Sequence, residues 1–323
     1  MKYLITGITG QDGIFLTNYI LNLDKKNEIL GITRSRNKNS FYKNLKYLRN
    51  DFDEASINLA SINLLEESAV FGLVENYKPD FIFNLSGPSS VYSSYNNPEY
   101  TYDSITKIFG NLTKACQDLR LFCNFFQPSS SEMFKKNKGA KLTENSEFEP
   151  LSPYAKAKYK IHNDVFDLRK RHDWNISSGI LFNHESEFRK NEYLFMKIIT
   201  SAIKIKKGSL NNLTLGSLDL IRDWSYAKDV AEAIFIMTHS SNGDDYVIGS
   251  GIGHSIRHLV EIIFQYFNLD FLEYLLIDET LLRERTPNVI ISNPKKIREN
   301  LGWEAKTTFD ELIEKCIKFK LSN

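Results

Sequence analysis

The chain has 323 residues, of which 42% are hydrophobic and 25% charged, a composition typical of a folded globular protein and not of a disordered one. Lysine and arginine number 41 against 40 aspartate and glutamate, and a net charge of +1 gives no indication of a nucleic-acid or membrane partner. No window approaches the roughly 20 apolar residues that span a bilayer, and the first residues lack the pattern of a signal peptide. The three cysteines have no CxxC spacing, which predicts buried free thiols in a reducing cytosol at Cys116, Cys123 and Cys316.

From residue 1 to about residue 182, apolar β-type runs alternate with amphipathic stretches. The runs predict strands at Tyr3–Thr6, Ile29–Thr33, Phe81–Leu85, Phe122–Gln127 and Ile176–Phe182. The stretches between them predict helices at Ile14–Leu23, Glu66–Tyr77, Tyr102–Leu119 and Tyr154–Arg171. This alternation is typical of an α/β fold with a doubly wound parallel sheet that carries helices on both faces.

After residue 183 the predicted segments become shorter and more mixed. They are helices at Leu194–Lys206, Lys228–His239, Ser255–Phe267, Pro294–Asn300 and Phe309–Lys320, and strands at Leu213–Leu215, Tyr246–Ile248 and Leu272–Ile277. We therefore expect residues 183–323 to form a smaller mixed α/β substrate lobe, with residues of about 218–240 returning to the first domain. The cleft between the two parts is the expected ligand site.

A glycine-rich loop follows the first predicted strand. Gly7, Gly10 and Gly13 are spaced three apart (GITGQDG) and lead directly into an apolar helix start. Such glycines let the backbone turn tightly and approach a pyrophosphate at the helix N-terminus. A tight turn alone could also use them, but their place at the first strand–helix junction favours a dinucleotide site. We therefore predict a Rossmann-type cofactor-binding domain over residues 1–182.

The end of the second predicted strand indicates which dinucleotide binds. An acidic residue about 20 positions after the glycines usually binds the free ribose hydroxyl of NAD. This chain has Arg34, Ser35 and Arg36 there instead. Two guanidinium groups suit a 2′-phosphate, although a solvated basic turn is the simpler alternative. We predict NADP as the cofactor.

A possible catalytic group lies on and before the fourth predicted helix. Tyr154 and Lys158 are four residues apart and share one helix face. The ammonium group is expected to lower the pKa of the phenol, so that Tyr154 can act as a base. Ser130 follows the preceding strand and should face the same crevice, where it could bond a substrate oxygen, unless it serves only in a turn or helix cap.

Glu132 adds a carboxylate to this group. It stands two residues after Ser130 and could remove a carbon-bound proton, although it could equally be a solvated surface acid. The histidines outside the motifs, such as His162, His239 and His254, are expected to be surface or core residues. No His, Cys and Asp cluster has metal-ligand spacing, so we predict no metal.

The glycine loop and the Tyr-x-x-x-Lys pair together resemble the extended short-chain dehydrogenase/reductase superfamily. A more specific stretch, Gly179–Ser186 (GILFNHES), is similar to the GDP-mannose 4,6-dehydratase family. Other pieces agree with that family in order along the chain: PEYT at 98–101, SSE at 130–132, SPYA at 152–155, LG at 215–216, RDW at 222–224, AKD at 227–229 and LGW at 301–303.

The resemblance implies roles for residues at matching positions. Ser130, Glu132, Tyr154 and Lys158 match the family's catalytic residues. The implied cofactor contacts are Gly7, Ile8, Thr9, Gly10, Gln11, Asp12, Gly13, Arg34, Ser35, Arg36, Asn63, Leu64, Leu85, Ser86, Gly87, Ser89, Tyr100, Lys158, His184 and Arg189. The implied contacts to the nucleotide-sugar are Asn183, Lys197, Arg222 and Arg283.

Several positions depart from the family's pattern. Asn63-Leu64 stands for the usual Asp-Leu, and Ser86–Ser89 (SGPS) for Ala-Ala-Gln-Ser. Residues 187–190 read EFRK where relatives have Pro-Arg-Arg-Gly, and residues 193–197 read YLFMK where relatives have Phe-Val-Thr-Arg-Lys. Arg283-Glu284 replaces an Arg-Pro pair. These departures spare the catalytic residues and concern the exact sugar and the assembly.

The resemblance implies NADP-dependent dehydration of GDP-mannose to GDP-4-dehydro-6-deoxy-mannose, by a hydro-lyase that transfers hydride internally from C4 to C6. One alternative is a dehydratase of another GDP-sugar such as a GDP-heptose. Another is an epimerase or reductase of the same superfamily, and such an enzyme does not need an acid/base at Glu132. A further alternative is a redox-inactive NADP-binding protein. Relatives also imply a homodimer or homotetramer, with the loop Arg34–Phe41 reaching a neighbouring subunit.

Overall fold

A large parallel sheet forms the centre of the computed structural model, which describes residues 1–322 apart from 35–37, 50–51, 53–56, 136–138 and 282–287. The sheet has seven strands in the spatial order β10-β6-β5-β4-β1-β2-β3. Their bounds are β1 (Lys2–Thr6), β2 (Glu28–Ile32), β3 (Ile57–Ala60), β4 (Phe81–Asn84), β5 (Asn124–Ser130), β6 (Ile176–Leu181) and β10 (Asp245–Ile248). All neighbouring pairs are parallel, so the predicted α/β, doubly wound fold is confirmed.

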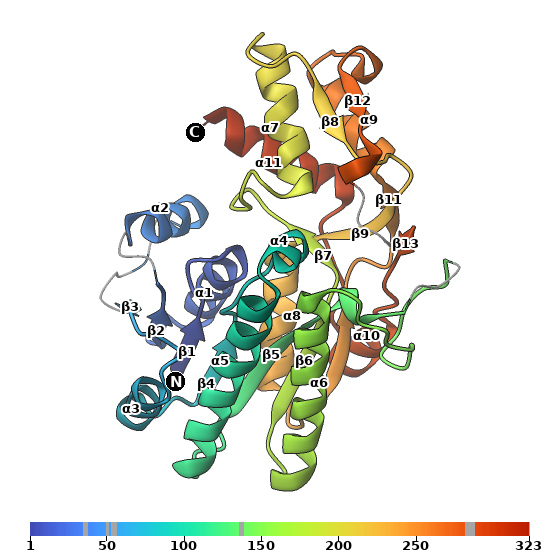
Figure 1. Ribbon diagram of the computed structural model, residues 1–323. Coiled ribbons are helices and arrows are strands. Elements are labelled where there is room, and N and C mark those ends of the chain that lie inside the picture. The colour runs from blue at the N-terminus through green and yellow to red at the C-terminus, as the bar shows by residue number, and fades with distance from the viewer. Residues whose placement is uncertain (35–37, 50–51, 53–56, 136–138, 282–287, 323) are drawn as a thin grey trace.

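Helices cover both faces of this sheet (Figure 1). One apolar cluster joins the sheet to α3 (Glu67–Tyr77), α5 (Pro98–Asp118) and α6 (Pro153–His172). A second, larger cluster joins its other face to α1 (Gln11–Leu23), α2 (Asn39–Leu48) and α8 (Ala227–His239). The short helix α4 (Val91–Asn96) precedes α5. Because both faces are buried, the strands are nearly continuous apolar runs.

The second part of the chain forms a smaller lobe above the carboxyl ends of the strands (Figure 1). Its helices are α7 (Leu194–Lys206), α9 (Ile256–Tyr266) and α11 (Phe309–Ser322), whereas α10 (Lys295–Leu301) packs beside β10 of the large sheet. Its strands are β7 (Asn183–Glu185), β8 (Leu213–Leu215), β9 (Ile221–Tyr226), β11 (Gly253–Ser255), β12 (Leu275–Ile277) and β13 (Val289–Ile290), in sheets that centre on β9 and on the β8–β12 pair. α8 and β10 return to the large sheet, where β10 extends its edge beside β6.

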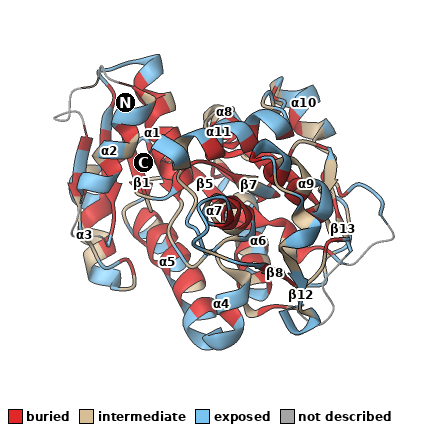
Figure 2. Cartoon of the chain, turned by 90° about the horizontal axis from the view of Figure 1, so that it is seen from above, coloured by how far each residue is buried: buried red, intermediate tan, exposed pale blue. Residues whose placement is uncertain are grey.

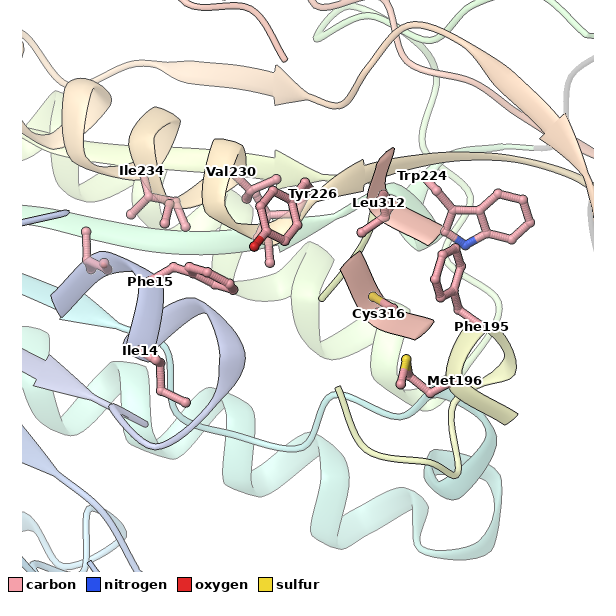
Figure 3. Packing of buried hydrophobic residues seen from close by; sticks show 14 of the residues in the cluster. Ile14, Phe15, Phe195, Met196, Trp224, Tyr226, Val230, Ile234, Leu312 and Cys316 are labelled. Carbon is pink, nitrogen blue, oxygen red and sulfur yellow. The ribbon is translucent and has the colours of Figure 1, made fainter. Parts of the chain in front are cut away.

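The core of the large domain continues into the lobe. Figure 3 shows Phe15 of α1 and Val230 of α8 at one end of this cluster, and Trp224, Phe195 and Cys316 of the lobe at the other. Seen from above, α7 is largely buried, whereas α4 is exposed (Figure 2). The shared core fixes the lobe above the sheet and so places the crevice between them.

Two predicted features can be checked against individual side chains. All three cysteines are buried and free, as expected. Met196, which stands where relatives carry arginine, is fully buried in the shared core near Cys316 (Figure 3). This departure from the family's pattern is therefore a core substitution.

Within the described residues, every helix is too short or too polar to cross a membrane.

The apolar pattern of the sequence does not predict the strands β3 and β9, and the structure shows the physical reasons. β3 is an edge strand in which only two of four side chains are buried, so its apolar pattern is weak. β9 buries the polar residues Arg222, Asp223 and Ser225, which interrupts the pattern of a buried strand.

Candidate active site

The glycine loop after β1 has the geometry of a phosphate-binding turn. Gly7 has a φ of +68°, and a Cβ added there would lie 2.6 Å from the carbonyl oxygen of Leu85. A Cβ at Gly13 would lie 2.5 Å from the carbonyl oxygen of Ile8, so α1 packs directly on the loop. Gly10 caps α1 without a side-chain hydrogen bond, and a Cβ there would meet only Gly7 within 4 Å. The N-terminus of α1 is therefore open toward a ligand phosphate.

An acid in the first turn of α1 is compensated by two basic groups. Asp12 lies 3.2 Å from His184 Nε2, and His184 Nδ1 is 2.8 Å from the carbonyl oxygen of Phe182. Burial would raise the pKa of Asp12, but His184 and Arg189 outweigh burial and hold this pKa below its usual value. Burial would lower the pKa of His184, but Asp12 raises it above the usual value. The ion pair removes the repulsion that a lone carboxylate would exert on a diphosphate.

A cavity along the carboxyl ends of β1, β2 and β4 brings together most of the predicted cofactor contacts. It is lined by Gly7, Thr9, Gly10, Gln11, Asp12, Arg34, Asn63, Leu64, Leu85, Ser86, Gly87, Ser89, Tyr100 and Arg189. Ile8 is buried below the loop, and Gly13 packs against it. Ser35 and Arg36 lie outside the described residues. Arg34 Nη1 donates to the hydroxyl of Tyr100 at 3.0 Å.

The residues of this cavity fit a dinucleotide. A glycine cradle lies at the start of α1, and apolar side chains of Ile62, Leu64 and Ile108 line the same cavity and can contact a base. Ile62 and Ile108 are not among the predicted contacts. Ile62 follows β3, which the sequence pattern does not predict, whereas its neighbours Asn63 and Leu64 are predicted cofactor contacts.

The four predicted catalytic residues line one adjacent cavity: Ser130, Glu132, Tyr154 and Lys158. Asp12, Asn183, His184 and Arg189 line it as well. Ser130 ends β5, and its hydroxyl accepts a hydrogen bond from the backbone NH of Glu132 at 3.2 Å. The Ser152 hydroxyl caps α6 by accepting from Ala155 N at 3.0 Å, so Tyr154 and Lys158 lie on the first two turns.

The pKa relation between Tyr154 and Lys158 differs from the prediction. Burial raises the pKa of Tyr154 to about 12, although a hydrogen bond with Ser130 acts in the opposite direction. Burial lowers the pKa of Lys158 to about 8, against the charge of Asp12. Lys158 Nζ lies 5.7 Å from the centre of the Tyr154 ring and donates to the carbonyl oxygen of Pro128 at 2.9 Å. The protein's own groups therefore raise the pKa of Tyr154, and the prediction that Lys158 lowers it is wrong.

Arg189 connects the two cavities, since it lines both. Its guanidinium lies 3.6 Å from the ring centre of Tyr193, and its Nε is 3.3 Å from Glu185 Oε2. The Tyr193 hydroxyl lies 2.8 Å from Ser89 Oγ, which belongs to the opposite wall. Tyr193, which the sequence did not single out, therefore joins the two walls of the crevice.

The predicted nucleotide-sugar contacts are spread more widely. Asn183 lines the catalytic cavity. Lys197 Nζ instead donates to the carbonyl oxygen of Thr214 at 2.8 Å, and Arg222 Nη1 to that of Ile221 at 2.8 Å. Neither side chain is in the described lining of the two cavities. Arg283 lies outside the described residues.

Comparison with known proteins identifies the family. A sequence profile for GDP-mannose 4,6 dehydratase matches residues 4–316. The Arabidopsis thaliana GDP-mannose 4,6 dehydratase 2 is 32% identical over 320 residues, which cover 97% of this chain and 85% of that protein.

Two solved structures share the fold at lower identity. The dTDP-glucose 4,6-dehydratase of Bacillus anthracis, in complex with NAD, has a TM-score of 0.84 and 19% identity and covers 100% of this chain and 97% of its own. RMD from Pseudomonas aeruginosa, complexed with NADPH, has a TM-score of 0.82 and 19% identity and covers 99% of both chains. With the catalytic residues gathered in one cavity and the profile matching nearly the whole length, the chain belongs to the GDP-mannose 4,6-dehydratase family, and it is a hydro-lyase.

Proposed function

We propose that this enzyme dehydrates GDP-mannose to GDP-4-dehydro-6-deoxy-mannose with NADP as a permanently retained cofactor. The observation that carries this proposal is that Glu132 lines the same cavity as Tyr154 and Lys158. An alcohol dehydrogenase step needs only a base such as Tyr154, whereas elimination of water also needs a group that moves a proton at carbon. Glu132 is the carboxylate available for that task.

The reaction begins at the 4-hydroxyl of the hexose. Ser130 holds this hydroxyl by a hydrogen bond, and Tyr154 removes its proton. When bound, NADP supplies the hydride acceptor at C4, later the hydride donor at C6, and a positively charged ring. Because burial raises the pKa of Tyr154 to about 12, that positive charge and the Lys158 ammonium have to favour the phenolate in the loaded site.

Glu132 then carries out the elimination. The new 4-keto group acidifies the C5 hydrogen, and Glu132 removes this proton. Glu132 returns it to the departing 6-hydroxyl, so that one water leaves and a C5–C6 double bond forms. Return of hydride to C6 and addition of a solvent proton at C5, in place of the proton that Tyr154 took from the 4-hydroxyl, complete the product. The atoms balance as substrate minus one water, and no net reductant is consumed.

The choice of NADP over NAD rests on Arg34. Among the described residues that line the cofactor cavity, Asp12 is the one carboxylate, and it is paired with His184. A guanidinium at the adenine ribose favours a 2′-phosphate and gives no acceptor to a free 2′-hydroxyl. The departure Asn63 is also compatible with an added negative charge.

The experiment that tests the function is incubation of the purified enzyme with GDP-mannose and no added cofactor, followed by mass spectrometry of the nucleotide-sugar. Loss of one water supports the proposal. An unchanged mass with a new sugar isomer would identify an epimerase. A reductase would leave GDP-mannose unchanged and, with added NADPH, would add two hydrogens only to a 4-keto sugar offered in its place. Running a GDP-heptose in parallel tests the alternative sugar.

We also infer that the enzyme assembles as a closed homodimer or homotetramer, as the family resemblance implies. Light scattering at micromolar concentration should give at least the mass of a dimer. A particle of 37.4 kDa would contradict this inference.

A further inference from the structure

A third residue of α6 follows the same spacing as the catalytic pair. Tyr154, Lys158 and His162 are four residues apart and therefore share one helix face. This face packs against the end of β5, where the catalytic serine stands. The sequence predicted His162 to be a surface or core residue, and it is indeed buried, with 7% of its surface exposed.

Two members of this row contact consecutive residues of β5. Lys158 Nζ donates to the Pro128 carbonyl at 2.9 Å, and His162 Nδ1 lies 3.1 Å from Ser129 Oγ. The third, Tyr154, is influenced by Ser130, the next residue of the strand. The helix that carries the catalytic side chains is therefore held to β5 directly beside the catalytic serine.

The histidine bond belongs to a closed, buried network. His162 Nδ1 lies 3.1 Å from both Ser129 Oγ and Ser178 Oγ, and the two hydroxyls are 2.9 Å apart. Ser129 and Ser178 expose 2% and 0% of their surfaces. The ring also packs edge-on against Phe148, at 5.4 Å between centres. Both hydroxyls are buried, so without the imidazole nitrogen one of the two loses its acceptor within this network.

The surroundings decide which nitrogen accepts. Nε2 faces Asp245 Oδ2 at 3.8 Å, and Asp245 is held by Arg169 at 2.8 Å. Burial lowers the pKa of His162, opposed by Asp245 and assisted by Arg169. A neutral ring with its hydrogen on Nε2, toward the carboxylate, leaves Nδ1 to accept from a serine hydroxyl.

We propose that His162 is a positioning residue for the catalytic groups: by accepting a hydrogen bond from the Ser129–Ser178 pair, it fixes α6 on β5 and β6, so that Tyr154 meets Ser130 and Lys158 meets Pro128. Ser129 stands between the two residues to which Tyr154 and Lys158 bond. A shift of Ser129 therefore moves the hydroxyl that meets Tyr154 and the carbonyl that holds Lys158 together. The assignment rests on the proposed function only in the role that it gives to Tyr154.

Two substitutions at position 162 separate hydrogen bonding from packing. His162→Leu fills part of the space but removes the acceptor, whereas His162→Asn places an amide oxygen close to where Nδ1 stood. We expect His162→Leu to lower kcat for GDP-mannose by about 10- to 100-fold, as small displacements of catalytic groups do, with KM within twofold of wild type. We expect His162→Asn to stay within about threefold of wild-type kcat.

His239 provides a matched control. It also contacts aromatic rings and a tyrosine hydroxyl, with Nε2 at 3.2 Å from Tyr3, but Tyr3 and Phe81 place it at the amino ends of the strands, away from the cavity. His239→Leu should lower the unfolding temperature as His162→Leu does, while leaving kcat within threefold of wild type.

A second readout does not depend on GDP-mannose. Because Lys158 lines the cavity next to the one that fits a dinucleotide, His162→Leu should also weaken binding of NADPH. Fluorescence titration of enzyme stripped of its bound cofactor measures this, and His162→Asn should restore the binding. If wild type proves inactive on GDP-mannose, the proposed function fails and this binding measurement still decides the role of His162.

If His162→Leu does not fold, Ser129→Ala tests the same hydrogen-bond network and should also lower kcat. The inference is overturned if folded His162→Leu, or Ser129→Ala in its place, keeps wild-type kcat and NADPH affinity, or if folded His162→Asn is as defective as His162→Leu.

Discussion

The crevice at the carboxyl ends of the large sheet and the substrate lobe above it assemble their polar side chains in different ways. In the crevice, Ser130 ends β5, and Tyr154 and Lys158 occupy the first turns of α6, so strand order and helix spacing bring them into one cavity. In the lobe, Lys197 and Arg222 donate to backbone carbonyls of their own lobe.

This difference shows which groups are already in working positions. The crevice residues face a shared cavity, and their geometry follows from the most regular part of the fold. The lobe residues stabilise loops and strands and must exchange those bonds for ligand oxygens if they bind a nucleotide-sugar. Changes in the crevice should therefore act on the rate, and changes in the lobe on substrate binding.

The largest effects are expected for Tyr154→Phe and Glu132→Gln, each about 10²- to 10⁴-fold in kcat, because each removes a group that transfers a proton. They should differ in kind. In deuterated water, Glu132→Gln should show transient reduced-cofactor absorbance but no deuterium at C5, whereas Tyr154→Phe should show neither. Near-wild-type turnover of Glu132→Gln would remove the main residue-level support for dehydration.

Lys158→Met should lower kcat, by less than either of those two changes, and yet stabilise the fold at neutral pH. The pKa of Lys158 is lowered from 10.5 to about 8, so between these values the unfolded chain binds more protons than the folded one. The cost of burying the charge is therefore full below about pH 8 and is relieved as the pH rises toward 10.5. The unfolding temperature of Lys158→Met should exceed that of wild type at pH 7, and the difference should shrink at pH 10. A difference that grows with pH contradicts the assignment.

Arg34→Ala tests the adenine end of the crevice. Loss of a charge-assisted contact to a 2′-phosphate should weaken NADP by about 10- to 100-fold and leave NAD nearly unchanged. Fluorescence titration of enzyme stripped of its bound cofactor, with both reduced dinucleotides, measures this. Tyr100→Phe, which removes only the hydroxyl that Arg34 contacts, is the milder control. Equal losses for both cofactors would refute the preference for NADP.

Lys197→Met should have the smallest effect on the chemical step. If Lys197 exchanges its bond to Thr214 for a diphosphate oxygen, KM for GDP-mannose should rise about tenfold with kcat within threefold of wild type. An unchanged KM together with a lowered unfolding temperature would assign Lys197 a purely structural role in the lobe.

The parts that could be predicted from the sequence are those with a local signal. The glycine loop, the Tyr154–Lys158 spacing and the apolar strands of the large sheet each involve neighbouring residues, and these appear where they are predicted. The predicted strand Leu272–Ile277 is instead a 3-10 turn at Phe271–Glu273 followed by the shorter β12. The crevice followed from the rule that ligands bind at the carboxyl ends of parallel strands.

The rest depends on contacts between distant parts of the chain. The bond of His162 to Ser129, and the approach of Asp245 to it, require the pairing of β5, β6 and β10, which no local pattern reveals. Tyr193 meets Ser89 across 104 positions. The direction of the Tyr154 pKa shift was missed because burial, which sequence spacing does not report, outweighs the effect of a nearby charge.

The central claim, internal transfer of hydride from C4 to C6, is tested most directly with GDP-mannose that carries deuterium at C4. The enzyme should convert it to a GDP-4-dehydro-6-deoxy-mannose that retains this deuterium at C6, as read by NMR and mass spectrometry, in ordinary water and without added cofactor. A product whose C6 carries only solvent-derived or unlabelled hydrogen would contradict the account, as would deuterium that remains at C4.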